Sequence, residues 1–231
     1  ENAHATASST LTNPRKRLGA EIAWLPGVGP KKASELVATL EANPGKIPDQ
    51  DGIPSLARAN LLVGGLKSKS KNIRKEELPE WIVGIAEAYD NVEPEDALKL
   101  INEDREVSGF PSVTDRHAFE AELDSRRQHF KSVIRDALNQ LAPDDLVTVI
   151  TGVVEEATEM GDLPAPLLID DLVDIYEVEA QGFLDDEETI IQDLTDKLRA
   201  KVDGGSANSD IKPMVDRLVR IVRNWDVVAQ P

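Results

Sequence analysis

The spacing of apolar residues is the feature that most constrains the fold of this chain of 231 residues. From residue 13 onward, apolar side chains recur every three or four positions, which is the period of a helix with one buried face. One such stripe, in residues 210–228, consists of Ile211, Met214, Val215, Leu218, Val222 and Trp225. No segment convincingly alternates apolar and polar residues with the period of two that marks a strand. The sequence therefore predicts an all-α fold.

Helix boundaries follow from prolines, glycines and acidic residues. Proline suits the first turn of a helix, where no amide partner is needed, and Pro30, Pro79, Pro94 and Pro143 all precede helical patterns. Short connections between such helices favour antiparallel neighbours, and hence a bundle. The predicted helices are 13–24, 30–42, 54–65, 79–90, 93–103, 115–141, 143–160, 165–182, 186–203 and 210–228.

Charge is distributed unevenly along a chain whose net charge is −17. Residues 1–75 contain twelve Lys and Arg against six Asp and Glu, a net charge of +6, whereas residues 76–231 carry the remaining −23. A basic part of this kind can lie on phosphates while an acidic part stays away from them. The alternative is that the acidic part is only a well-solvated surface, which a moderately halophilic host would also favour.

Three parts are predicted along the chain. Residues 1–12 are small and polar, and we expect a disordered tail. Residues 13–104 form a basic helical region, and residues 115–231 form an acidic antiparallel helical bundle. The domain boundary is placed in the linker 104–114 because Gly, Pro and Ser interrupt the helical pattern there.

The composition also limits the compartment and the chemistry. The chain has no cysteine, which excludes disulfides and thiolate metal sites and fits a reducing compartment. No run of eighteen apolar residues and no signal peptide is visible, so we expect a cytoplasmic protein that does not enter a membrane. Because the chain begins with Glu1 rather than Met, we expect a fragment of a longer protein.

A glycine-rich turn in residues 22–36, which read IAWLPGVGPKKASEL, is the segment with the clearest chemistry. Gly27 and Gly29 have no Cβ, so they permit positive φ and let a ligand approach the backbone closely. Val28 is expected to turn inward and hold the turn on the core. The amides of the turn and of the following helix are expected to point outward without partners at the positive end of the helix dipole, which favours an anion.

Residues 13–42 resemble the helix-hairpin-helix family in the succession of an apolar residue, Pro, Gly, an apolar residue, Gly, a basic stretch and Ala. The resemblance implies binding to the sugar-phosphate backbone of double-stranded DNA without base readout, and therefore a strong dependence on salt. The family's backbone contacts fall here on Gly27, Val28, Gly29, Lys31 and Lys32. The pattern occurs only once in the chain, although members usually place two copies on a duplex.

A second basic run, GLKSKSKNIRK, follows the third predicted helix. We add Lys67, Lys69 and Lys71 from this run to the predicted nucleic-acid-binding residues, because they would extend a phosphate track if the chain folds them beside the hairpin. The alternative for this run is a solvated loop, and the alternative for the hairpin is a purely structural role.

Residues 130–231 more weakly resemble a helical region of long bacterial J-domain-containing proteins. The resemblance rests on APLLIDDLVDIYEVEAQGFL, residues 165–184, and IVRNWDVVAQP, residues 221–231. The His-Pro-Asp tripeptide that defines a J domain is absent, so chaperone stimulation is not implied. What the resemblance implies is a protein-interaction or scaffold domain within a larger stress or defence protein, held by a protein partner or by the rest of that chain.

Catalytic patterns are weak. His4, His117 and His129 are too far apart in the sequence to share a metal or a proton relay. Acidic clusters such as Asp170, Asp171 and Asp174 are better explained by helix capping and solvation than by Mg²⁺ binding. We therefore expect a non-enzymatic DNA-binding module, or else a scaffold domain, with no catalytic residue, no metal site and no cofactor. A metal-dependent nuclease is the weakest of the three possibilities.

Overall fold

A computed structural model describes residues 10, 12–69, 73–204 and 208–229, and the predicted tail 1–12 lies almost wholly outside this part of the chain. All regular structure in the described residues is helical, which confirms the predicted all-α class. The α-helices are α2 (Pro14–Ile22), α3 (Pro30–Ala42), α4 (Ser55–Lys69), α5 (Leu78–Asp90), α6 (Pro94–Val107), α7 (Arg116–Leu138), α8 (Pro143–Ala157), α9 (Leu167–Asp203) and α10 (Asn208–Ala229). Two single 3-10 turns, Pro44–Lys46 and Lys75–Glu77, precede α4 and α5.

Three predicted boundaries are wrong. Helix α6 continues past its predicted end at residue 103 to Val107, so the first residues of the predicted linker 104–114 are helical. The predicted helices 165–182 and 186–203 form one helix of 37 residues, α9. The acidic run from Asp185 to Glu188 looked like the start of a new helix, but no proline or turn interrupts the backbone there. Helix α4 continues past the predicted end at residue 65 to Lys69, because its glycine pair Gly64–Gly65 lies inside the packed core rather than in a loop.

Helix α5 lies at the centre of the main core. Its side chains Trp81, Ile82 and Ile85 are almost fully buried, and it contacts α4, α7, α8 and α9. The same cluster includes Leu25 near the N-terminus and Tyr176 of α9. Packing is therefore continuous across the linker 104–114, and the predicted domain boundary does not coincide with a gap in the core.

A smaller core cluster holds the hairpin end of the molecule together. It joins Leu18 and Ile22 of α2 to Ile101 of α6 and to Phe119 and Leu123 of α7. This packing places α6 beside the first helix of the hairpin, although about eighty residues separate them in the sequence. The position of α6 determines what the hairpin can do.

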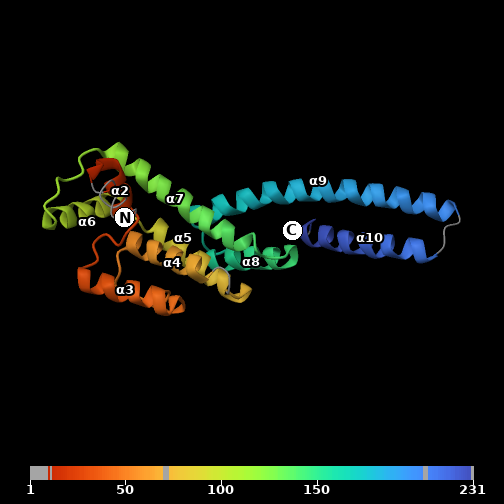
Figure 1. Ribbon diagram of the computed structural model, residues 1–231, viewed down its shortest axis with the longest axis horizontal. Helices are drawn as coiled ribbons and strands as arrows, with labels where there is room; N and C mark the ends of the chain where they lie inside the picture. Colours follow the sequence, from red (N-terminus) through yellow and green to blue (C-terminus); the bar gives the residue numbers. More distant parts are fainter. Residues whose placement is uncertain (1–9, 11, 70–72, 205–207, 230–231) are drawn as a thin grey trace, which may run out of the picture.

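The last two helices form a long arm. Helices α9 and α10 run antiparallel and extend away from the other helices, and the end of α10 returns to α8 (Figure 1). The first turns of α9 belong to the body, because Leu168, Ile169 and Leu172 are buried in the main core. Farther out, α9 and α10 bury mainly each other, as Leu194 and Ile221 show.

Candidate functional site

The turn between α2 and α3 has the backbone that the sequence predicts. Gly27 has a φ of 74°, the left-handed conformation that favours glycine. Gly29 has φ −58° and ψ 151° and occupies the N-cap position of α3, so Pro30 begins the helix as expected. Val28 is partly buried against the main core. The segment is therefore a tight helical hairpin with its glycines on the exposed side.

Helix α4 supports the hairpin. Leu25 and Ala33 are buried in the main core, whereas Trp24 is 57% exposed. The side-chain amide of Asn60 in α4 donates to the carbonyl of Ile22 at 2.8 Å and to that of Trp24 at 2.7 Å. These bonds satisfy carbonyls at the end of α2, where helices lack partners.

The amides of the turn are not all free, which corrects the main sequence expectation. The N–H of Gly27 donates to Oδ2 of Asp104 in α6 at 2.9 Å, and the N–H of Val28 donates to the carbonyl of Leu25 at 3.1 Å. Leu100, one turn before Asp104, lies so close to Gly27 that a Cβ there would be 2.8 Å from its Cδ2. A carboxylate of the chain itself therefore lies where the sequence predicts a phosphate.

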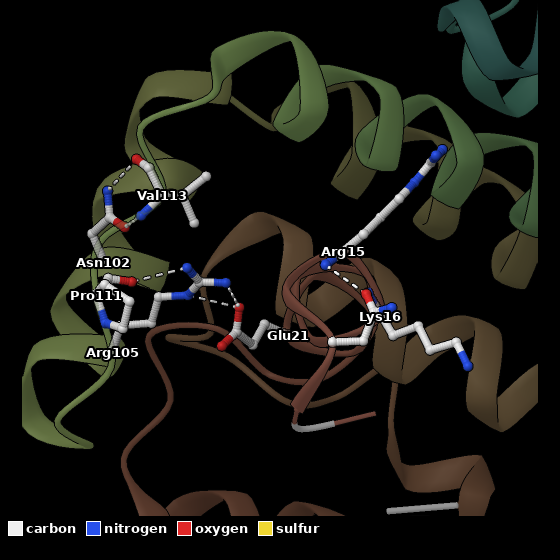
Figure 2. Close-up of polar contacts among 8 residues, drawn as sticks. Arg15, Lys16, Glu21, Asn102, Arg105, Pro111 and Val113 are labelled. Atoms are coloured by element: carbon white, nitrogen blue, oxygen red, sulfur yellow. Dashed lines mark hydrogen bonds and ion pairs between the residues drawn. The ribbon is translucent and has the colours of Figure 1, made fainter. Parts of the chain in front are cut away.

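A buried ion pair holds α6 against the hairpin (Figure 2). Arg105 is 8% exposed, and its Nε and Nη2 donate to Oε2 of Glu21 in α2 at 2.9 and 2.6 Å. Its Nη1 donates to the carbonyl of Pro111 at 3.0 Å, which fixes the following loop as well. Asn102 exchanges two hydrogen bonds with the backbone of Val113 in the same loop. Helix α6, which carries Asp104, is therefore held to α2 by Arg105 and to the following loop by Arg105 and Asn102.

The first turn of α3 is the part of the site that stays open. Lys31 and Lys32 are exposed, and no described residue accepts a hydrogen bond from their backbone amides or pairs with their ammonium groups. Nothing lies within 4 Å of a Cβ built on Gly29. The groove between this end of the hairpin and α6 is lined by the carboxylates of Glu21, Glu103 and Asp104 and by the guanidinium groups of Arg17 and Arg105, of which Arg105 pairs with Glu21.

The second basic run does not join the hairpin. Lys69 lies at the opposite end of α3, beside Gly45, and Lys31 is about 20 Å away along a helix that rises ~1.5 Å per residue. The Nζ of Lys69 donates to Oε2 of Glu77 at 2.7 Å, and Lys69 together with Arg74 lowers the pKa of Glu77. Lys67 is exposed near α7, and Lys71 lies outside the described residues. The expected continuous phosphate track is therefore not formed by the described residues of this run.

Other chemistry finds little support in the described part of the chain. No group of three or more His, Asp and Glu residues there is arranged to hold a metal ion. His117 is fully exposed beside Glu120, whereas His129 is half-buried, and the two do not meet. None of the described helices combines the length and the apolar character that a membrane span needs.

Comparison with known proteins gives no neighbour. No family model, no curated protein and no solved structure matches this chain.

Proposed function

We propose that this chain is a non-enzymatic protein-interaction or scaffold domain in which the hairpin is structural. The contact between the Gly27 amide and the Asp104 carboxylate is the observation that carries this proposal. A phosphate would have to displace Asp104 from the Gly27 amide and then lie beside that carboxylate and the carboxylate of Glu103 in the groove. Removing a carboxylate from an N–H donor and bringing a second anion beside it are both unfavourable.

The arm formed by α9 and α10 is the surface that we assign to the partner. Val215, Val219 and Val222 of α10 are 40%, 63% and 41% exposed, and their spacing of four and three places them on one stripe. Other apolar residues of α10, such as Leu218 and Ile221, are shielded, and the helix packs against α9 and α8. A second, solvent-facing apolar stripe on an already paired helix is the surface that an amphipathic partner helix requires.

Site-specific photo-crosslinking tests this assignment. A photoreactive amino acid at Val219 is expected to give a discrete covalent adduct in cells of the source organism, because the partner covers this stripe. The matched control is Val107 at the end of α6, which is 90% exposed but lies outside the arm. Adducts of equal yield at Val107 and Val219, or no adduct at Val219, would contradict the assignment.

Binding to the backbone of double-stranded DNA is the second candidate function, and one observation favours it. The backbone amides of Lys31 and Lys32, together with their ammonium groups, are directed to solvent at the positive end of α3. These groups suit a phosphate that approaches from the side away from α6. Affinity would then depend on the few cations at this end and would fall steeply with salt.

Gel shifts of duplex DNA over a salt series separate the two functions. The scaffold proposal predicts no shift at low salt. The DNA proposal predicts a shift that the double substitution of Lys31→Glu and Lys32→Glu abolishes, and that Asp104→Asn strengthens. Glu106→Gln is the control for charge, because Glu106 is exposed on the same helix and does not line the groove beside the hairpin. A shift that Glu106→Gln strengthens equally would reflect net charge and not the hairpin.

A further inference from the structure

Arg126 of α7 is an arginine with a partly buried side chain and no acidic partner. Its Nε donates to Oδ1 of Asn60 at 2.6 Å, and its guanidinium lies over the ring of Phe130 at 5.0 Å. No carboxylate in the described part of the chain pairs with it, and burial lowers its pKa to about 10. The amide and the ring thus hold the guanidinium in place without neutralising it.

Acidic partners are available to other basic residues of α7. Arg127 and Lys131 both pair with Asp171 of α9, at 2.7 and 3.1 Å. Among the described residues, Arg126 differs from the exposed Arg217, which also lacks a carboxylate partner, because its side chain is partly buried. Because Asn60 takes only Nε, the two terminal nitrogens stay available in the planar fork that binds carboxylate and phosphate oxygens in a bidentate way.

Two further basic side chains lie beside Arg126. His129 is one turn farther along α7, and Lys67 is two turns beyond Asn60 on the same face of α4. The pKa of His129 is lowered by its burial and by the positive charges of Arg126 and Lys67, and no other charged group acts on it appreciably. Cations from two packed helices therefore converge on one place between α4 and α7.

We propose that Arg126, His129 and Lys67 form a binding site for a phosphate group. Arg126 and Lys67 supply two positive charges at neutral pH, which match a phosphate dianion better than a single carboxylate. His129, whose imidazole lies within the field of both cations, takes up a proton when the anion binds. Asn60 links this site to the hairpin, because its Oδ1 accepts from Arg126 while its Nδ2 donates to the carbonyls of both Ile22 and Trp24.

The proton uptake of His129 provides the test. Its imidazole signal is followed by NMR against pH, with inorganic phosphate as the probe and sodium chloride at equal ionic strength as the reference. Phosphate is expected to raise the pKa of His129 by about one unit, the effect of an opposite charge within a few ångströms. The fully exposed His117 is the internal control, and a His129→Gln variant assigns the signal.

Three variants separate the site from general effects. Arg126→Gln is expected to abolish the phosphate-dependent shift. Arg126→Lys keeps the charge but loses the fork, and Lys67→Gln removes an exposed side chain, so each is expected to reduce the shift in a folded protein. The proposal would be overturned by an unchanged His129 pKa in phosphate, by a shift of His117 equal to that of His129, or by shifts in Arg126→Lys and Lys67→Gln that are as large as in the parent. In a parallel titration, a short DNA duplex replaces inorganic phosphate. An upward shift of the His129 pKa with either probe supports the site, and the probe that causes it identifies whether the bound phosphate is free or part of a nucleic acid.

Discussion

Replacing Gly27 and Gly29 by alanine, one at a time, tests the hairpin geometry directly. Gly27 has φ 74°, where a side chain costs roughly 1–2 kcal/mol. The new methyl group would also lie 2.8 Å from Cδ2 of Leu100, so that side chain must shift, which adds about 1 kcal/mol. Reduced freedom of the unfolded chain returns roughly 0.4–1 kcal/mol. We expect Gly27→Ala to lower the free energy of unfolding by about 2 kcal/mol.

Gly29 is the matched control because its backbone, with φ −58° and ψ 151°, suits any residue and its surroundings are empty. Gly29→Ala is expected to change the free energy of unfolding by less than ~1 kcal/mol, because the gain of roughly 0.4–1 kcal/mol through the unfolded state is offset by the poorer N-cap preference of alanine at the start of α3. Thermal unfolding followed by circular dichroism measures both. For a chain of this size the shift in Tm is about 2–4 °C per kcal/mol, so Gly27→Ala should lower Tm by ~4–8 °C.

Equal effects of the two substitutions, or greater damage from Gly29→Ala, would refute this reasoning about the turn. The pair also bears on function. A methyl group on Gly29 projects where a phosphate would approach α3, so the DNA proposal requires Gly29→Ala to weaken a gel shift without loss of stability. The scaffold proposal requires no effect on partner crosslinking at Val219.

Two further predictions concern the core and the basic run. Gly65→Ala would place a methyl group 2.6 Å from two ring carbons of the buried Trp81, and this overlap, worth roughly 1–3 kcal/mol, should exceed the gain in helix propensity of ~1 kcal/mol. Gly64→Ala meets only the end of a flexible leucine side chain and should raise Tm, so a lower Tm for both would contradict this packing. The hydrogen bond from Lys69 is the main cause of the lowered pKa of Glu77. Ionised Glu77 therefore stabilises the fold at a pH above its unfolded pKa, and this stabilisation is lost as the pH falls through its folded pKa. Glu77→Gln should therefore be less stable than the parent at pH 7 by urea unfolding, and the difference should shrink as the pH falls below the unfolded value of about 4.3 and vanish only below the lowered folded pKa.

The helices could be predicted from the sequence because their signals are local. Apolar spacing, prolines at first turns and the two hairpin glycines determine where α2 and α3 begin and end. The predictions fail where the role of a residue is set by contact with a segment that is distant in the sequence. Asp104 lies 77 residues from Gly27 and looks like one of many solvated acids on α6, so no local pattern indicates its contact with the hairpin.

Asn60 and Arg126 were missed for the same reason, although a faint signal exists for one of them. Asn60 is the single amide in the apolar stretch SLARANLLVGGL of α4, and a polar side chain on a buried helix needs partners. Arg126 gives no such signal, because its lack of a carboxylate becomes visible only when α4 and α7 are packed. Of the predicted binding residues, the structure brings together those of the hairpin and leaves Lys67 and Lys69 apart from them.

Helix α9 is fixed in the body at one end and forms the arm at the other, with no break in its backbone. Such a helix acts as a lever, because a tilt at its root is magnified at its tip. At ~1.5 Å per residue, some thirty residues beyond the core correspond to about 45 Å, so a tilt of only ~5° would move the tip by about 4 Å. A molecule seated on the arm would thereby be mechanically coupled to the packing around Leu168 and Leu172.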